Sequence, residues 1–132
     1  MIGVDRSTRT FALHPMDADL TYGRLREEGE RGRQALNRRV ANWYAAEALP
    51  EHEWRSVNDV TFQRYEFEHR ARAGDFDAAA RVLGSFDEFL ILQGSVSAAV
   101  SMHLLIDGRL EDPEAQAMHF LGLGIARIRG GP

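Results

Sequence analysis

The stretch EFEHRARAGDFDAAARVL, residues 66–83, decides the fold, because it holds the end of one helix and the start of the next. Gly74 can take the left-handed backbone conformation that ends a helix, and Asp75 is a favourable N-cap for the helix that follows. Because a short turn reverses the chain, the two helices form an antiparallel hairpin. The pattern predicts a short helix over Phe76–Leu83 and a break at Gly84-Ser85.

Helical patterns continue on the N-terminal side of this hairpin. Four residues form one buried stripe with i, i+4, i+7, i+8 spacing: Leu36, Val40, Trp43 and Tyr44. Ala48 continues this stripe, and Pro50 ends the helix. Residues 51–73 are helical but less regular, and Asn58-Asp59 is where they would break. Their candidate core side chains are Trp54, Val57, Phe62, Tyr65 and Phe67.

Further helices are predicted on the C-terminal side. An apolar segment ending at Gln93-Gly94 contains Phe86, Phe89, Leu90 and Leu92. Ser95 can cap the next helix, which ends at Gly108 and has one face formed by Val96, Val100, His103 and Leu104. Asp112-Pro113-Glu114 combines an N-cap, a first-turn proline and an early acid, so it starts the final helix. If a neighbouring segment packs against it, that helix is expected to bury one set of residues: Ala117, Phe120, Leu121, Gly124 and Ile128.

The N-terminal residues show the only strand pattern. Ile2–Val4 and Thr8–His14 alternate around a polar turn, and Pro15 begins a helix that runs to about Arg24. We therefore expect an all-α fold of about seven helices in antiparallel helical hairpins, with a short N-terminal β-hairpin. The domains expected are residues 1–25, the β-hairpin with its helix, and residues 26–132, the helical array.

Composition limits the class of protein. The 132 residues are 44% hydrophobic and 27% charged, with a net charge of −4, which is typical of a globular domain and unfavourable for phosphate backbones. Cysteine is absent, so disulfides and thiolate metal sites are excluded and a reducing, cytoplasmic location is expected. No apolar run approaches the roughly 18 residues that span a bilayer, and no secretory signal is present. All sixteen basic residues are arginine, which we attribute to coding bias.

The histidines and carboxylates do not form a recognisable catalytic or metal-binding motif. His14 lies three residues before Asp17, but a histidine capping the next helix is the favoured interpretation, and His52 sits in a solvated turn. Glu66 and His69 form an ExxH pair, the unit of four-helix di-iron sites, but no second copy exists, which favours a local contact.

Two further histidines, His103 and His119, are interpreted as hydrogen-bonded core residues. We predict no catalytic residue, no cofactor and no metal site.

Short motifs resemble a tetratricopeptide repeat. Gly74, Phe76 and Ala79 match the turn glycine, aromatic and small residue of its second helix. The first half of a further repeat is matched by four residues: Phe120, Leu123, Gly124 and Gly131. Arg127 stands in place of the usual tyrosine. Pro113 lies just before the first helix, where repeats are commonly separated. The resemblance implies stacked helix pairs with a concave binding surface.

The order of these segments resembles the junction after the winged-helix domain in STAND-type signalling ATPases, the NB-ARC and NACHT group. TFALHPMDADLTYGRL resembles the end of the wing and the following helix, and ALNRRVANWYAAEALPEHEW resembles a linker helix before the repeats. The resemblance implies an arm that senses or holds a partner. No GxxxxGK[ST] phosphate loop is present, so no nucleotide-binding role is implied.

We therefore expect a non-enzymatic protein–protein interaction or regulatory segment that binds a protein partner or self-associates, with no membrane attachment and no nucleotide site. An unfinished last repeat would leave an apolar face uncovered. The expected partner surface is Trp43, Tyr44, Trp54, Tyr65, Phe120, Leu121 and Ile128. The alternatives are a carboxylate/histidine metalloprotein using Glu66 and His69, and weak DNA binding through Arg31, Arg33, Arg38 and Arg39, although nucleic acid is disfavoured.

Overall fold

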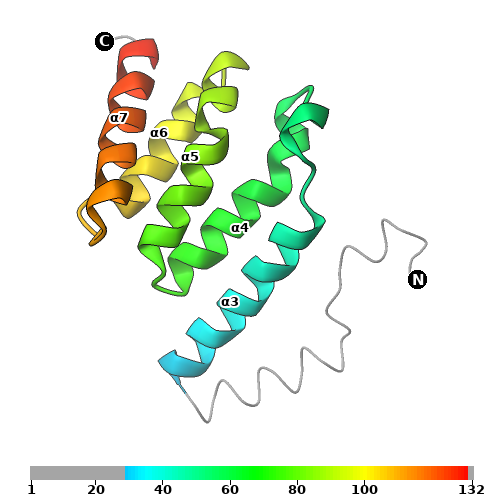
Figure 1. The fold of residues 1–132 in the computed structure, drawn as a ribbon, viewed down its shortest axis with the longest axis vertical. Coiled ribbons are helices and arrows are strands. Elements are labelled where there is room, and N and C mark those ends of the chain that lie inside the picture. The colour runs from blue at the N-terminus through cyan, green and yellow to red at the C-terminus, as the bar shows by residue number, and fades with distance from the viewer. Residues whose placement is uncertain (1–28, 131–132) are drawn as a thin grey trace. The chain divides into compact units, whose positions relative to one another are not determined.

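A computed structural model describes residues 29–130, and this part of the chain is entirely helical (Figure 1). Two 3₁₀ turns, Glu51–Glu53 and Val57–Val60, precede α4, and the helices are α3 (Glu30–Glu47), α4 (Thr61–Arg72), α5 (Phe76–Leu92), α6 (Val96–Ile106) and α7 (Pro113–Gly130). The all-α prediction is confirmed for these residues. The predicted β-hairpin, the helix from Pro15 and the 1–25 domain lie outside them. The repeat-like stacking of hairpins stays a prediction.

Internal contacts divide the chain into two units, residues 1–36 and 37–132, and α3 continues from the first into the second. In the first unit the structure describes the start of α3, where Arg33 Nε donates to Glu30 Oε1 at 3.2 Å. The helix begins within the charged residues REEGERGR, 26–33 of the sequence, and it ends at Glu47, before Ala48. Within residues 29–130, no helix is long and apolar enough to cross a bilayer.

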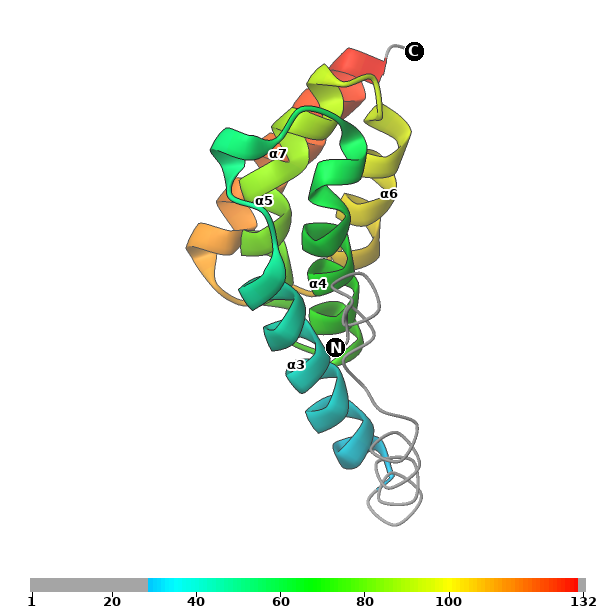
Figure 2. The same cartoon turned by 90° about the vertical axis from the view of Figure 1, so that its right-hand side faces the viewer.

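Helix α5 lies at the centre of the second unit, where it packs against α4, α6 and α7 (Figures 1 and 2). Its side chains Leu83, Phe86 and Leu90 are almost completely buried. Each such large apolar side chain stabilises the fold by roughly 1.5–3 kcal/mol relative to exposure. The sequence identified all three as apolar, but the predicted break at Gly84-Ser85 is wrong, because α5 is continuous. A glycine inside a helix costs only about 1 kcal/mol, so burial on both sides of it outweighs the break.

The two turns that flank α5 are built alike. Gly74 has φ +82°, and its N–H donates to Ala71 O at 3.0 Å while Asp75 N–H donates to Arg70 O at 2.9 Å. Gly94, with φ +86°, makes the same pair of bonds at the other end of α5. These are Schellman motifs, which use a left-handed glycine to satisfy the last carbonyls of a helix. The prediction that Gly74 ends a helix is confirmed.

The predicted N-caps differ in outcome. Asp112 Oδ2 accepts from Ala115 N at 3.0 Å, so the Asp112 cap of α7 is confirmed. Asp75 and Ser95 occupy the N-cap positions of α5 and α6 without a side-chain capping bond. The Asp75 carboxylate instead accepts from Arg38 at 2.8 and 3.1 Å, which ties the start of α5 to α3. A competing ion pair therefore decides how that side chain is used.

Several predicted core positions are wrong in detail. Tyr65 is 41% exposed, Leu104 is exposed, and Val40, Trp43 and Tyr44 are only half-buried. The residues that α7 buries are Ala115, His119, Leu123 and Ala126, not the predicted set. In α7 the buried stripe lies on a different face from the one predicted, because period alone does not show which side meets the neighbouring helices. In α4 and α6 the prediction is partly right, since Phe67 and His103 are buried.

The chain between α3 and α4 breaks earlier than Asn58-Asp59 suggested. The extended residues Trp54–Ser56 separate the two 3₁₀ turns. Asp59 Oδ2 accepts the backbone N–H of Arg55 at 2.7 Å and of Ser56 at 2.9 Å. Trp54 is buried against Phe89 and donates from Nε1 to Leu49 O at 3.0 Å. An indole held on both sides fixes the position of this loop.

We expect replacement of Asp59 by asparagine to flatten the acid side of the stability curve. The two backbone donors, first Arg55 and then Ser56, lower the pKa of Asp59 below 3.8. A carboxyl group whose pKa is lower in the folded state stabilises the fold at pH values above its unfolded-state pKa. This stabilisation is lost as the pH falls through its folded-state pKa. Denaturant unfolding of both proteins between neutral pH and pH values below 3.8 measures the difference. Parallel curves would contradict the prediction.

Candidate functional site

A chain of four polar side chains crosses the apolar interior between α5, α6 and α7. Asp87 on α5 contacts His103 Nε2 at 3.0 Å through Oδ2. The two imidazoles meet through their Nδ1 atoms at 3.1 Å, and His119 Nε2 on α7 contacts Asp107 Oδ1 at 2.8 Å. Both histidines are only 2% exposed. We call these residues, Asp87, His103, His119 and Asp107, the histidine network.

The histidine network runs from a buried end to an exposed end. The Asp87 side chain is 12% exposed, whereas the Asp107 side chain, just after α6, is 47% exposed. Hydrogen bonds through the two imidazoles therefore connect the exposed Asp107 carboxylate to the nearly buried Asp87 carboxylate. Because Asp87 lies on α5, His103 and Asp107 on α6 and its C-cap, and His119 on α7, the histidine network also joins these three helices to one another.

Gly122 on α7 makes room for the histidine network. A Cβ atom there would lie 2.6 Å from Asp87 Oδ2, 2.7 Å from His103 Cε1 and 2.9 Å from His103 Nε2. All three distances are below normal contact, so only glycine lets α7 approach this carboxylate and ring. Gly124, two residues later, has nothing within 4 Å of a Cβ position. The two glycines of the sequence GLG therefore have different structural roles.

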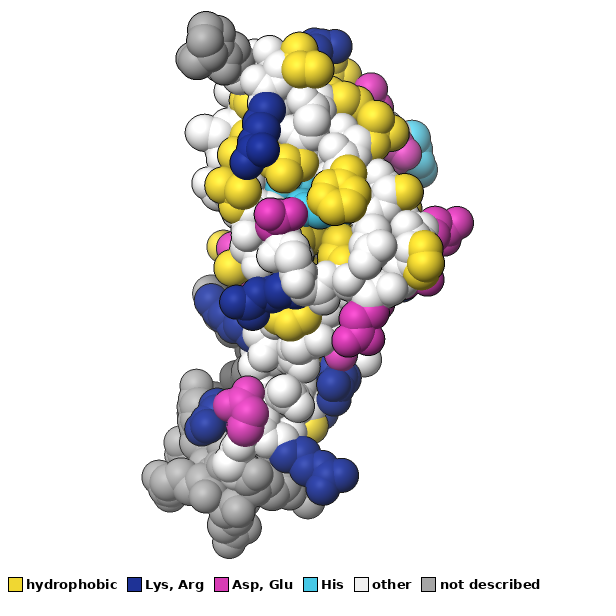
Figure 3. Space-filling view, turned by 90° about the vertical axis from the view of Figure 1, so that its left-hand side faces the viewer, with side chains coloured by type: hydrophobic (Ala, Val, Ile, Leu, Met, Phe, Trp, Pro, Cys, Tyr) yellow, Lys and Arg dark blue, Asp and Glu magenta, His cyan; other side chains and the backbone are white. Residues whose placement is uncertain are grey.

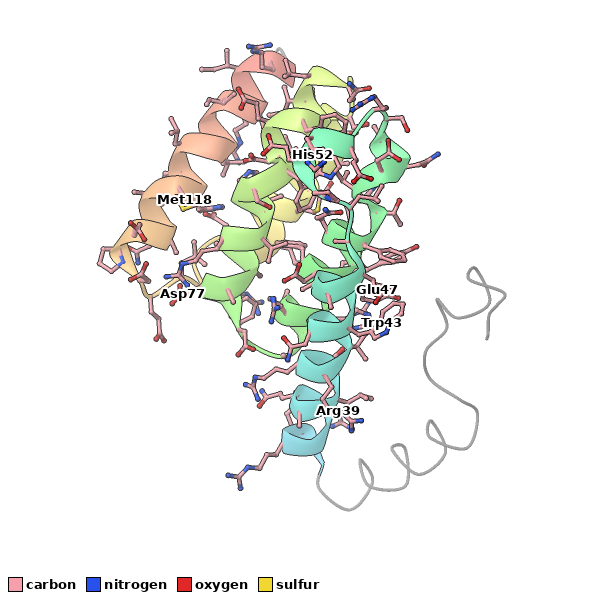
Figure 4. All side chains as sticks on the ribbon, turned by 45° about the vertical axis from the view of Figure 1, so that its right-hand side comes forward. Arg39, Trp43, Glu47, His52, Asp77 and Met118 are labelled. Atoms are coloured by element: carbon pink, nitrogen blue, oxygen red, sulfur yellow. The ribbon has the colours of Figure 1, made fainter. Side chains whose placement is uncertain are left out.

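A groove of about 400 Å³ lies directly above the buried end of the histidine network, between α5 and α7. Asp87 and Glu88 contribute carboxylates to it, and the rest of its lining is glycine and apolar side chains: Gly84, Ile91, Met118, Leu121, Gly122 and Ile125. Figure 4 shows Met118 on the side of α7 that faces α5. The methyl group of Met118 lies over Gly84, where a Cβ would be 2.5 Å away.

The outer side of α7 is strongly apolar. Leu121 is 66% exposed and Ile128 is 79% exposed, and Met118 and Ile125 are also exposed. We call these four residues the α7 face. Figure 3 looks onto this side of the molecule and shows hydrophobic side chains gathered over its α7 part. Phe120, also exposed at 64%, projects from α7 as well. Large apolar side chains gathered on one helix surface mark an interaction site.

The predicted partner residues fall into separate places. Phe120, Leu121 and Ile128 lie exposed on α7, as described above. Trp54 is buried, so its assignment to a partner surface is wrong. The other three predicted aromatic residues pack between α3 and α4: Trp43, Tyr44 and Tyr65. Phe62 packs with them, and neighbouring ring centroids in this group lie 5.2–5.8 Å apart. Trp43 is seen on α3 in Figure 4. These rings hold the two helices together and leave little of Trp43 and Tyr44 for a partner.

His69 stacks on Tyr44 at the edge of these rings, with ring centroids 5.8 Å apart. Its Nδ1 contacts Asn37 Oδ1 at 2.8 Å. Burial, and secondarily the charge of Arg72, lower the pKa of His69, so the fold favours its neutral form. This contribution to stability is present at pH values above the unfolded-state histidine pKa of about 6.5, and it is lost as the pH falls through the folded-state pKa. Burial likewise raises the pKa of Tyr44.

The alternative metal site at Glu66 and His69 is not assembled by the described residues, whereas DNA binding through the arginine cluster stays a prediction. Glu66 accepts from Arg70 Nε at 2.8 Å, while His69 turns to Asn37, so the two are engaged with different partners. Residues 29–130 bring together no group of three or more histidine, aspartate or glutamate side chains that could hold a metal ion. In the arginine cluster, Arg33 and Arg38 form ion pairs with Glu30 and Asp75.

Sequence reasoning identified His103 and His119 as hydrogen-bonded core histidines, which is confirmed, but it missed the two aspartates. A usable signal exists. Asp87, His103 and His119 are each sixteen residues apart and lie on three successive helices. The midpoints of the two intervals, residues 95 and 111, lie in the connections from α5 to α6 and from α6 to α7, so each reversal of the chain brings the next residue back to the same level. Polar residues repeated at that interval on apolar faces predict a buried network.

No protein-family model, curated protein or solved structure matches this chain.

Proposed function

We propose that this chain is a non-enzymatic protein–protein interaction segment whose contact surface is the α7 face together with the α5–α7 groove. The single observation that supports it most is the exposure of Leu121 and Ile128, the two large apolar side chains at 66% and 79%. Covering such side chains gains about 25 cal/mol for each Å² of apolar area removed from water. The surrounding helices are held by a buried polar network, so the surface is rigid enough to be recognised.

The occupant we propose is a second copy of the chain, packed antiparallel along α7. Met118, Leu121, Ile125 and Ile128 follow a 3-4-3 spacing, which is the pattern of a coiled-coil seam. A two-fold axis near residue 123 would set Leu121 opposite the partner's Ile125. The same axis would set Met118 opposite the partner's Ile128. One stripe therefore complements itself, as a two-fold interface requires.

Charges at the two ends of α7 favour the antiparallel direction. The exposed Glu114 continues the stripe at its N-terminal end, and the exposed Arg129 follows Ile128 at the other. At 1.5 Å of rise per residue, the two-fold axis places Glu114 about 4.5 Å along the axis from the partner's Arg129. That offset is within the reach of both side chains. A parallel arrangement would instead bring glutamate to glutamate and arginine to arginine.

Replacing Leu121 by glutamate is expected to weaken self-association at least about tenfold, because a charge would enter the centre of the stripe. The matched control is Leu105→Glu on α6, a leucine of comparable exposure, 51%, that lies on another helix. Sedimentation velocity over a wide range of loading concentrations measures both. Equal effects of the two changes, or a wild-type chain that stays monomeric throughout, would contradict the proposal.

A charge-reversal pair tests the direction of packing. Glu114→Arg alone and Arg129→Glu alone should each weaken self-association, because each places like charges together. The combined variant restores opposite charges and should recover the wild-type dissociation constant. Two single changes whose effects simply add in the combined variant would contradict the antiparallel arrangement while leaving the apolar contact surface standing.

The resemblance to the arms of STAND-type ATPases supports a broader proposal, that this segment is related to the sensor side of such proteins. The support is limited to the sequence motifs at residues 10–25, 35–54, 66–83 and 119–124. A neighbouring reading frame that encodes a phosphate loop and a winged helix would support this relationship.

A further inference from the structure

The histidine network contains three hydrogen bonds, and each needs one proton. Carboxylates only accept, so His103 Nε2 and His119 Nε2 both carry hydrogen when both aspartates are ionised. The contact between the two Nδ1 atoms then requires one further hydrogen, shared at 3.1 Å. Two neutral imidazoles supply only two hydrogens in total. The arrangement is therefore complete only when the histidine network holds three protons.

Neither neighbouring protonation state satisfies the geometry. With two protons, the two Nδ1 lone pairs face each other, or one of the aspartate contacts loses its hydrogen. With both imidazoles fully protonated, two N–H groups point at each other across 3.1 Å. An unsatisfied buried polar group costs roughly 1–3 kcal/mol, so each of these states is penalised. Two carboxylates bracket the imidazole pair and neutralise the single positive charge from both sides.

The groups that face the pair are known for each packed element within residues 29–130. Helix α5 contributes Asp87, with Glu88 beside it in the groove, and α6 contributes His103 followed by Asp107. Helix α7 contributes His119 and the hydrogen side chain of Gly122. No arginine among the described residues contacts the histidine network, so the shared proton is its one positive charge.

The surroundings of the imidazole pair, and not the gap between the rings, argue against a metal ion. Zinc sites in proteins are tetrahedral, and metal–nitrogen bonds of about 2.0–2.1 Å then place two ligand nitrogens about 3.3–3.4 Å apart, close to the observed 3.1 Å. A metal ion there would need further ligands beside the two imidazoles. The described part of the chain supplies none.

We propose that the histidine network is a proton-dependent latch that fastens α7 to α5 and α6. The latch is closed with three protons, and it weakens when a rise in pH removes the shared one. Because α7 carries the α7 face, the same proton would control whether that face is held in place. The latch itself rests on the hydrogen-bond geometry and stands whether or not the α7 face binds a partner.

The sign follows from the count of protons. An unfolded chain above about pH 7.5 has neutral histidines, whose ordinary pKa is near 6.5, and ionised aspartates, so these four residues hold two protons. The closed latch holds three by its hydrogen-bond geometry, so closing it makes stability fall as the pH rises. His69, whose pKa is lowered by burial, stays neutral in the folded chain over this range.

The test is unfolding of the whole chain by denaturant between about pH 7.5 and 8.5, where one extra proton in the folded state predicts a tenfold loss in the folding constant per pH unit. Replacing His52 by glutamine, at a side chain 80% exposed, should leave that slope unchanged. Replacing Asp107 by asparagine, at the exposed end, should reduce it. A flat wild-type profile would overturn the proposal.

Nitrogen NMR of the wild-type chain provides a second measurement that does not depend on any variant folding. At neutral pH the two buried histidines should show three protonated ring nitrogens between them, and one Nδ1 signal should change as the pH is raised. Two protonated nitrogens throughout, or stoichiometric metal in the purified protein, would overturn the latch.

Discussion

Replacing His103 by alanine should destabilise the fold by about 3–5 kcal/mol, because two buried polar groups lose their partner at roughly 1–3 kcal/mol each and a cavity is left behind. His103 is 2% exposed and bonds Asp87 on one side and His119 on the other. Its removal leaves a buried carboxylate and a buried imidazole nitrogen without their partners and opens a cavity between three helices. Both penalties act on the same site, which places this change among the most damaging in the chain.

Denaturant titration followed by far-ultraviolet circular dichroism measures the loss. The control is His52→Ala, since that side chain is 80% exposed and surface changes usually shift stability by less than about 0.5 kcal/mol. If the alanine variant at position 103 lost no more than the control, the hydrogen bonds of the histidine network would have no net effect. A variant too unstable to purify is the extreme form of the expected result.

Replacing Gly122 by alanine should destabilise the protein by about 1–3 kcal/mol, although alanine is the better helix former by about 1 kcal/mol. The new methyl group would lie 2.6 Å from Asp87 Oδ2 and 2.7 Å from His103 Cε1. Neither atom can move away without losing its hydrogen bond. The steric cost therefore outweighs the gain in helix propensity, and the sign of the change is opposite to what a surface helix would show.

The matched control lies two residues away on the same helix. Gly124→Ala meets nothing within 4 Å, so it should be neutral or stabilising by up to about 1 kcal/mol. Thermal or denaturant unfolding of the two variants should move in opposite directions. Movement in the same direction would contradict the close approach of α7 to Asp87 and His103 at Gly122.

Combining the Gly122 and His103 changes tests their physical link. In the His103→Ala background the ring that clashes with the new methyl group is gone, so the cost of Gly122→Ala should shrink. Residues that contact one another commonly show interaction energies of about 0.5–3 kcal/mol in such cycles. Strict additivity would mean that the two sites act independently. Coupling would confirm that the glycine exists to admit the histidine network.

The histidine network and the α7 face share helix α7, and the groove between α5 and α7 connects them. Asp87 belongs to the histidine network and also lines the groove beside Leu121. An occupant of the groove would further desolvate that carboxylate, and desolvation makes its bond to a charged imidazole stronger. Binding at the groove and proton retention should therefore favour each other. This reciprocity is a general property of linked equilibria.

Local signals along the chain predicted the helix ends well. Gly74 and Pro113 act on their own backbone and on the adjacent residue, so their effect does not depend on the rest of the fold. The absence of strands after residue 28 follows from the same local patterns in the described part. The break at Gly84-Ser85 failed because the burial of Leu83 and Phe86 on either side outweighs a local preference.

By itself, the sequence determined that residues 29–130 form helices joined by glycine and proline turns, because these preferences act within a few residues. Only the tertiary structure decided which side of each helix is buried. A helical period shows that a stripe exists, but the neighbouring helices choose where it lies, and so Phe120, Leu121 and Ile128 are exposed while His119 and Ala126 are buried. The pairing of His103 with Asp87 and His119 likewise depends on atoms brought together from three helices.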